Sequence, residues 1–182
     1  MCIRDSLDSY GTVWRPENPT TTWPSSGAPT ISFDEPVGIY SRSDQAFLRI
    51  DEYFKVIADD RNYDGIGNDE FTIIDAGDDG SVAIKASNGN YLTVSDYGEV
   101  LLATASKIGI NQKFQWFELP TGDVALRPWS GSAHLIGTMS ATDGENYGLT
   151  GVIGAGVKRN GANSYRIVTS FTDTVEPLPD LP

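Results

Sequence analysis

The chain has 182 residues, with 25 acidic and 13 basic side chains and a formal net charge of −12 at pH 7. This length fits one domain with tails, and the charge disfavours nucleic acid and sulfated glycans, because polyanions are bound through Lys and Arg. The 19 glycines and 10 prolines predict many turns, and therefore an all-β rather than a helical architecture.

The first 30 residues are predicted to lie outside the folded domain. Met1–Ser6 resembles the artefactual leader of reading frames assembled from environmental DNA, so the lack of a signal peptide is uninformative. Proline recurs through residues 10–36, a composition typical of an extended linker. Trp14 and Trp23 are unusual for a linker; they either dock on the domain or end a preceding one. The single cysteine, Cys2, has no partner in the chain, and no apolar run is long enough to span a bilayer.

Residues 31–170 form the predicted compact unit, and this unit contains an internal repeat that is used three times. Each copy holds four short apolar strands with a polar turn between the first two. The matching positions Phe47, Tyr91 and His134 lie 44 and 43 residues apart. Apolar and polar residues alternate in several of the strands, as expected where one strand face meets a core. The predicted strands are 37–40, 47–50, 55–58 and 71–74 in the first copy, 82–85, 91–94, 100–103 and 114–117 in the second, and 124–127, 134–136, 150–153 and 165–168 in the third.

Three copies of a four-stranded unit predict a β-trefoil with pseudo-threefold symmetry. Four-stranded repeats also form propeller blades, but propellers usually need at least four blades. One copy alone would leave an apolar face in water, whereas three copies together bury it. His134 occupies the repeat position of Phe47 and Tyr91, which favours a structural role, and Trp116 lies in an alternating strand and is predicted to be core.

The second copy carries a family resemblance. Residues 82–92 (VAIKASNGNYL), followed by Ile108-Gly109 and Phe114, resemble the repeat of fascin-like β-trefoils, which include fascin-like and ricin-type carbohydrate-binding modules of bacterial glycoside hydrolases. The resemblance covers nearly the whole compact unit and is loosest in the third copy. It implies a secreted, non-catalytic module with a catalytic domain upstream in the same chain. Several sugar-binding relatives place Trp-Glu-Lys before the closing Phe; this tryptophan is absent from all three copies, so either the sugar site lies elsewhere or the ligand differs.

The loop at residues 60–70 begins with D-x-N-x-D-G, the opening of a calcium-binding loop. The bidentate Glu that closes an EF-hand is missing, because Phe71 stands at the twelfth position, and no helices flank the loop. A structural Ca²⁺ site of the loop-only kind is therefore one prediction. An acidic turn without metal is the alternative, since Asp, Asn and Gly also dominate ordinary turns. The predicted ligands are the side chains of Asp60, Asn62 and Asp64, the carbonyl of Ile66, and Asp69 or Glu70.

A tyrosine lies near an acidic residue after the second strand of each copy. An aromatic face packs against sugar C–H groups while carboxylates accept hydrogen bonds from sugar hydroxyls, so such a pair supplies both contacts. The alternative is that the tyrosines cap the barrel ends and the acids are solvated. A tryptophan in the turn 128–131 is a further stacking candidate, unless it packs under the longer third-copy loop. The predicted carbohydrate-binding residues are Asp51, Tyr53, Lys85, Asp96, Tyr97, Arg127, Trp129, Glu145 and Tyr147.

No catalytic motif stands out in the sequence. It has no nucleophile elbow, P-loop or His-rich metal signature, and acidic pairs are too common in turns to indicate a glycosidase. The favoured function is a module that anchors an extracellular polysaccharide-degrading enzyme to a neutral glucan or galactan through up to three weak sites. The alternative is a protein-interaction or structural trefoil, which is disfavoured because filament bundling draws on basic patches. Residues 171–182 are predicted to be a C-terminal linker.

Overall fold

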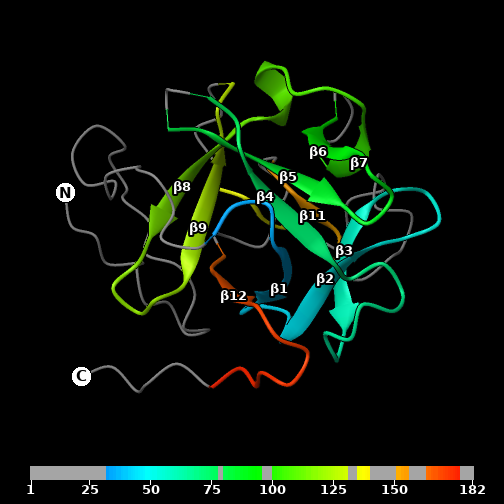
Figure 1. Ribbon diagram of the computed structural model, residues 1–182, viewed down its shortest axis with the longest axis vertical. Coiled ribbons are helices and arrows are strands. Elements are labelled where there is room, and N and C mark those ends of the chain that lie inside the picture. Colours follow the sequence, from blue (N-terminus) through cyan, green and yellow to red (C-terminus); the bar gives the residue numbers. More distant parts are fainter. Residues whose placement is uncertain are drawn as a thin grey trace.

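The computed structural model describes residues 32–77, 80–95, 100–130, 135–139, 151–155 and 163–176 (Figure 1). Within these ranges the chain is built from strands and one short 3-10 helix, η1 (Ile110–Gln112), so the all-β prediction is confirmed. No helix in this described part is long and apolar enough to cross a membrane. The strands are β1 (Pro36–Ser41), β2 (Ala46–Ile50), β3 (Val56–Asp60), β4 (Phe71–Asp75), β5 (Val82–Ala86), β6 (Tyr91–Val94), β7 (Leu101–Ala105), β8 (Phe114–Glu118), β9 (Val124–Pro128), β10 (Gly137–Thr138), β11 (Ile153–Gly154) and β12 (Tyr165–Val168).

Six strands close into a barrel. Each is antiparallel to its neighbours, and the ring runs β1–β4–β5–β8–β9–β12 and back to β1. The closing pair joins the first and last strands of the chain, with Gly38 opposite Val168 and Ser41 opposite Tyr165. A closed ring leaves no free sheet edge for another chain to pair with.

The other six strands form three hairpins, β2–β3, β6–β7 and β10–β11. Isolated bridges connect Lys55 with Leu102, Ile57 with Val152, and Val100 with Gly154, so each hairpin touches both of the others. Apolar residues of all three hairpins pack with those of the barrel in one core. A six-stranded barrel with a triangle of hairpins is a β-trefoil, and the predicted fold is therefore confirmed.

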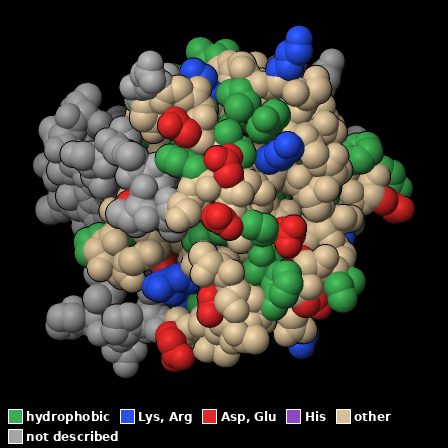
Figure 2. Space-filling view, in the orientation of Figure 1, with side chains coloured by type: hydrophobic (Ala, Val, Ile, Leu, Met, Phe, Trp, Pro, Cys, Tyr) green, Lys and Arg blue, Asp and Glu red, His purple; other side chains and the backbone are tan. Residues whose placement is uncertain are grey.

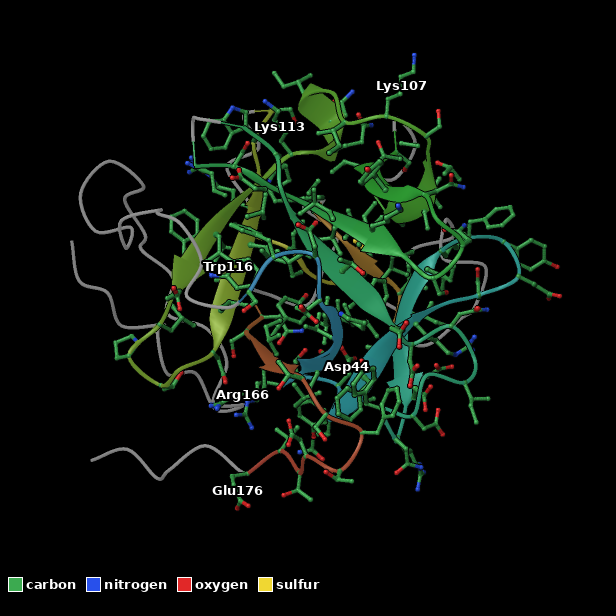
Figure 3. All side chains as sticks on the ribbon, viewed as in Figure 1. Asp44, Lys107, Lys113, Trp116, Arg166 and Glu176 are labelled. Atoms are coloured by element: carbon green, nitrogen blue, oxygen red, sulfur yellow. The ribbon has the colours of Figure 1, made fainter. Side chains whose placement is uncertain are left out.

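Large aromatic side chains from all three copies fill the barrel. Phe71, Phe114 and Tyr165 begin the closing strands of the three copies, and each is at most 1% exposed. Trp116 is equally buried, which confirms its predicted place in the core (Figure 3). Burying a large apolar side chain stabilises the fold by about 1.5–3 kcal/mol, so each of these aromatic positions contributes substantially to the core.

The third copy departs from the predicted strands. Its second strand was expected at 134–136, but β10 begins only at Gly137. The preceding strand, β9, ends at Pro128, which has no N–H group to donate to a neighbouring strand. Next to β9 the amide of Ile136 donates to the carbonyl of Leu126 (2.8 Å), ahead of the β10–β11 ladder. His134 lies outside the described residues.

Residues 171–176, predicted as linker, lie against the domain. The ring of Phe171 packs edge-on against Tyr63 with 4.8 Å between centroids. Val175 packs against the cluster around Phe47 and Tyr63, and the carbonyl of Glu176 accepts a hydrogen bond from Arg42 Nη1 (2.6 Å). The residues after 176 are rich in proline, which is typical of a linker. The two apolar side chains before them, Phe171 and Val175, nevertheless pack against the domain.

A buried ionic cluster connects the repeats beside the closing pair of strands. Asp123, in the turn between β8 and β9, is completely buried and accepts from Arg42 Nε (2.7 Å) and Nη2 (3.1 Å). Its other partner is Arg166 of β12, whose Nε donates to Asp123 Oδ1 (2.6 Å) and whose Nη2 donates to the carbonyl of Thr121 (3.0 Å) (Figure 3). One carboxylate thus holds two guanidinium groups from opposite ends of the chain.

Removing this carboxylate should destabilise the domain strongly. Asp123→Ala leaves two arginines without their buried partner, and breaking a buried pair in this way costs about 3–5 kcal/mol. Asp59→Ala is the matched control, because the Arg49–Asp59 pair has the same 2.6 Å contact but is about one-third exposed, and such pairs contribute about 1 kcal/mol or less. Urea unfolding measures both changes, and equal losses in the two variants would contradict the assignment.

Candidate functional site

Part of the predicted carbohydrate-binding set can be located. Asp96, Tyr97, Glu145 and Tyr147 lie outside the described residues. Of the three predicted tyrosine–acid pairs, the structure therefore describes the first, in the turn between β2 and β3.

Hydrogen bonds close this turn tightly. Oδ1 of Asp51 accepts from the amides of Tyr53 (2.9 Å) and Lys55 (2.8 Å). The amide of Asp51 donates to the carbonyl of Lys55 (2.9 Å), and the amide of Phe54 donates to the carbonyl of Asp51 (3.0 Å). The carbonyl of Phe54 accepts from the amide of Ala103 in β7 (2.8 Å), which fixes the turn to the next hairpin. We call residues 51–55 the Tyr53 hairpin.

The Tyr53 hairpin presents aromatic side chains to solvent. Tyr53 is 66% exposed and Phe54 is 47% exposed, and the neighbouring Glu52 is exposed as well. The second carboxylate oxygen of Asp51, Oδ2, is buried and has no hydrogen-bond partner among the described residues. The exposed ring of Tyr53 and the exposed carboxylate of Glu52 therefore lie together on a turn that Asp51 holds in place.

The other described members of the set lie on different elements. Lys85 is in β5, with Nζ 5.9 Å from the ring centroid of Tyr91 across the β5–β6 pair. Arg127 is in β9, and burial lowers the pKa of its guanidinium. Trp129 follows β9 and is half-buried, and its amide donates to the carbonyl of Lys113 (2.9 Å). These three residues belong to barrel strands and their ends, whereas Tyr53 belongs to a hairpin.

The predicted calcium loop connects β3 with β4 and is shaped by its own side chains. Asp60 Oδ1 accepts from the amide of Asn62 (3.2 Å), and Asp64 Oδ1 accepts from the amide of Ile66 (2.9 Å). Asp69 Oδ2 reaches back to the amide of Asp64 (2.9 Å). Each of the three carboxylates thus holds a backbone N–H group inside the loop.

The burial of Asp69 makes this loop electrostatically unusual. Asp69 is 0% exposed, and its Oδ1 has no hydrogen-bond partner among the described residues. Burial raises the pKa values of Asp69 and Asp60, and neighbouring carboxylates, with Asp64 common to both, raise them further. Glu70 is half-buried, and the side chain of Ile66 points to solvent.

In the part of the chain that the structure describes, no group of three or more His, Cys, Asp or Glu side chains is placed to hold a metal ion. Calcium binding stays a prediction of the sequence.

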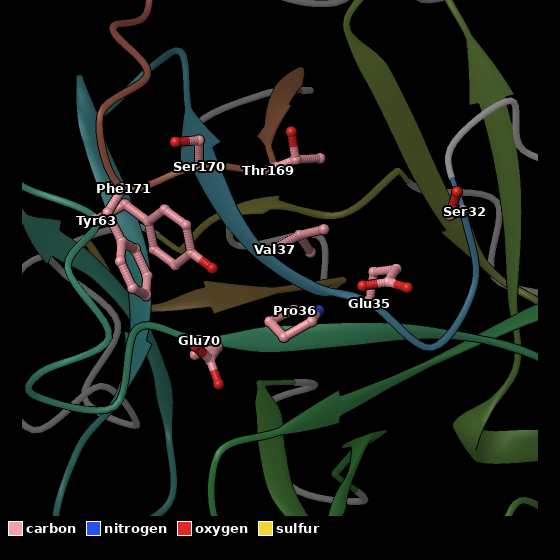
Figure 4. A pocket seen from close by; sticks show the side chains of 9 residues that line it. All are labelled: Ser32, Glu35, Pro36, Val37, Tyr63, Glu70, Thr169, Ser170 and Phe171. Atoms are coloured by element: carbon pink, nitrogen blue, oxygen red, sulfur yellow. The ribbon is translucent and has the colours of Figure 1, made fainter.

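Two hollows that the sequence does not indicate flank the pair Tyr63–Phe171. One, of about 740 Å³, is bordered by residues 32–37, 63–70 and 169–171 (Figure 4). The other, of about 750 Å³, lies between the β1–β2 turn, the end of β3 and residues 171–175. The sequence feature that could have indicated these hollows is Phe171, an aromatic residue in a segment whose other residues are typical of a linker.

Comparison with known proteins supports the fold. No protein-family model matches the sequence, and no curated protein matches it. Among solved structures, the chain is similar to the designed 3-fold symmetric protein ThreeFoil, with TM-score 0.58 and 19% identity over 74% of this chain and 99% of that one.

Two larger proteins also contain a similar region. A GlcNAcα1-4Gal releasing endo-β-galactosidase from Clostridium perfringens matches with TM-score 0.57 and 17% identity, over 75% of this chain and 33% of that one. A mosquitocidal holotoxin matches with TM-score 0.59 and 14% identity, over 78% of this chain and 18% of that one. At these identities the likeness concerns the fold, and this chain corresponds to a minor part of either protein.

The raised pKa of Asp69 gives a pH-dependent prediction. A carboxyl with a raised pKa destabilises the folded state when it is ionised, and this penalty disappears as the pH falls through the folded-state pKa. Asp69→Asn should therefore raise the melting temperature at pH 7, with the gain shrinking toward zero below the ordinary aspartate pKa of about 3.9. Asp75→Asn, at an exposed carboxylate outside the loop, is the control. Thermal unfolding across this pH range makes the measurement, and a gain independent of pH would contradict the assignment.

Calcium gives a separate prediction for the same loop. If the loop binds Ca²⁺ through Asp60 and Asp64, the ion raises the melting temperature of the wild-type chain, because it binds the folded loop preferentially. A chelator should reverse the shift, and Asp64→Asn should abolish it, while Asp75→Asn keeps it. A melting temperature that does not respond to calcium would leave the acidic turn, closed by its own hydrogen bonds, as the correct description.

Proposed function

We propose that this chain is a non-catalytic carbohydrate-binding module whose ligand is a neutral polysaccharide, a glucan or a galactan. The observation that carries the proposal is Tyr53, whose side chain is two-thirds exposed on a turn that also presents the exposed carboxylate of Glu52. The ring offers an apolar face to sugar C–H groups, and the adjacent carboxylate of Glu52 can accept hydrogen bonds from sugar hydroxyls. Both kinds of contact that a sugar needs are available on one turn.

The rigidity of the turn favours binding. Asp51 and the carbonyl–amide bond between Phe54 and Ala103 fix the backbone before a ligand arrives. A ligand that docks on a fixed turn does not have to order it, so less conformational entropy is lost on association. A shallow, exposed contact of this kind suits a polymer that continues past the site on both sides.

The charge of the chain supports a neutral ligand. Acidic and apolar side chains are interspersed over the face seen in Figure 2, and the whole chain carries a net charge of −12. This field repels uronic-acid and sulfated polymers. It leaves uncharged hydroxyl-rich chains unaffected, and these can donate hydrogen bonds to the carboxylates.

The comparison with the endo-β-galactosidase supports a role beside a catalytic domain. That enzyme contains a similar region in about a third of its chain. By analogy, the trefoil would belong to a secreted polysaccharide-degrading enzyme, with catalysis in another domain. If Tyr97 and Tyr147 act as Tyr53 does, up to three weak contacts would raise the effective concentration of the enzyme on the polymer.

Electrophoresis through gels that contain a neutral β-glucan or a galactan tests this function. The wild-type chain should be retarded, and Tyr53→Ala should weaken the interaction about tenfold, or about 1.4 kcal/mol, since the stacking face is lost. Tyr53→Phe keeps the ring and should retain most of the affinity. Ile110→Ala, which truncates a similarly exposed apolar side chain on η1, should have no effect.

Two results would count against the proposal. If no neutral polysaccharide retards the wild-type chain, carbohydrate binding is wrong and a protein partner becomes the better explanation. If the wild-type chain is retarded and Tyr53→Ala is retarded equally, the binding site lies away from the Tyr53 hairpin.

A further inference from the structure

The hollow of about 740 Å³ beside Phe171 has the composition of a second sugar site. We propose that it binds a ring of a neutral saccharide, separately from the Tyr53 hairpin. This inference rests on the proposed function, because it assigns a further site to the same class of ligand. We call this hollow the Phe171 pocket; its lining includes Glu35, Tyr63, Glu70 and Phe171.

Three segments that are distant in sequence form the Phe171 pocket (Figure 4). Residues 32–37 lead into β1, residues 63–70 belong to the β3–β4 loop, and residues 169–171 follow β12. Its volume lies within the range of about 300–1,000 Å³ that is usual for small-molecule sites. The closed barrel fixes all three segments, since each begins or ends at a barrel strand.

Phe171 provides an exposed aromatic ring that packs on a buried one, Tyr63. Its ring is 56% exposed and contacts Tyr63 edge-on at 4.8 Å and an interplanar angle of 63°. Tyr63 is only 5% exposed and packs directly on Gly38 of β1, where a Cβ atom would come within 2.6 Å of the ring. Phe47 belongs to the same buried cluster, with 6.0 Å between its ring centroid and that of Tyr63. The exposed ring is therefore held in place by buried ones.

Polar groups suited to sugar hydroxyls surround this ring. Glu35 and Glu70 contribute carboxylates, and Ser32, Thr169 and Ser170 contribute hydroxyls. The hydroxyl of Tyr63 points into the pocket (Figure 4). A phenol hydroxyl is protonated at neutral pH, so this group can donate a hydrogen bond.

The charge of the lining selects against anionic ligands. Neither Lys nor Arg lines the Phe171 pocket, and among the described residues neither Glu35 nor Glu70 has an ion-pair partner. A carboxylate or sulfate on the ligand would meet two uncompensated negative charges. A neutral saccharide instead offers hydroxyl donors to both glutamates and a C–H face to Phe171.

The Phe171 pocket does not belong to the threefold pattern. Counted from the aromatic residues that begin the closing strands, the position of Phe171 is occupied by Gly77 in the first copy and Pro120 in the second. Neither residue has an aromatic ring, so the pocket has no equivalent at those two positions. A substitution at Phe171 can therefore be separated from effects at the Tyr53 hairpin.

Amide chemical shifts in a ¹H–¹⁵N NMR titration separate the two sites in one experiment. The probes are a β-1,3-glucan pentasaccharide and a β-1,4-galactan pentasaccharide, with a galacturonic acid pentasaccharide as the charged control. With a neutral probe we expect two groups of shifted amides, one at residues 169–171 with Glu70 and one at residues 51–54. Tyr53→Ala should remove only the second group, and Phe171→Ala only the first. The galacturonic acid probe should shift neither group.

Two further variants keep the test independent of folding. Phe171→Ala should weaken binding at the pocket about tenfold. Glu70→Gln, which preserves the size and shape of the side chain, should weaken it severalfold. Ile66→Ala removes an exposed side chain from the same loop without altering the pocket lining and should have no effect.

The outcomes distinguish this inference from the proposed function. If neutral saccharides shift amides only at the Tyr53 hairpin, or if Phe171→Ala and Glu70→Gln bind as the wild type does, the second site is refuted while the module stands. If the probes shift no amide in the wild-type chain, both proposals are wrong for these saccharides. If the galacturonic acid probe binds at residues 169–171, the charge argument fails and the assigned ligand class is incorrect.

Discussion

The pairing of β1 with β12 is the constraint on which the rest of the structure depends. It joins the first and last repeats through register pairs from Gly38–Val168 to Ser41–Tyr165 and turns a twisted sheet into a ring. Bringing together strands this far apart in the chain carries a large entropic penalty and slows folding. The penalty is offset by what closure buries: the aromatic core, and Asp123 between its two arginines. No single repeat could form either of these on its own.

A closed barrel also explains why the candidate sites lie where they do. Many side chains of the barrel strands pack into the core. The side chains that can contact a ligand therefore lie mostly on turns, loops and tails. The Tyr53 hairpin is anchored through its carbonyl–amide bond to Ala103, and the Phe171 ring rests on Tyr63, which packs on Gly38. In both places a rigid element holds an exposed aromatic ring, which is the arrangement that allows a weak contact to be specific.

Much of the fold was predictable because each copy of the repeat indicates its strands through short stretches of sequence. β6 and β12 begin and end at the predicted residues, since aromatic first positions and alternating polarity define a strand within four residues. The third copy was less predictable, because its second strand is the short β10, which begins at Gly137 and pairs with β11, while Ile136 before it bonds to Leu126 of β9. Local composition also concealed the packing of residues 171–176, whose contacts are with Tyr63 and Arg42, more than a hundred residues away.

The candidate sites were predictable only in part, for physical reasons. Tyr53 was identified because it lies among acidic residues in a turn, where an aromatic side chain is often exposed. Tyr63 has a similar sequence environment, yet it is buried, because Gly38 of a distant strand leaves space for its ring. The D-x-N-x-D pattern of the loop after β3 was ambiguous for another reason. The same carboxylate oxygens can bind a cation or accept backbone N–H groups, and only the three-dimensional arrangement shows that Asp60, Asp64 and Asp69 accept backbone amides.

We infer that this rigid trefoil presents exposed aromatic rings to a neutral saccharide. A crystal structure of the chain with a neutral oligosaccharide, taken from a polysaccharide that retards it in gels, tests this claim most directly. We expect a sugar ring stacked on Tyr53, with hydroxyls hydrogen-bonded to the carboxylate of Glu52 and the barrel unchanged. An ordered sugar bound elsewhere, away from any exposed aromatic side chain, would contradict it.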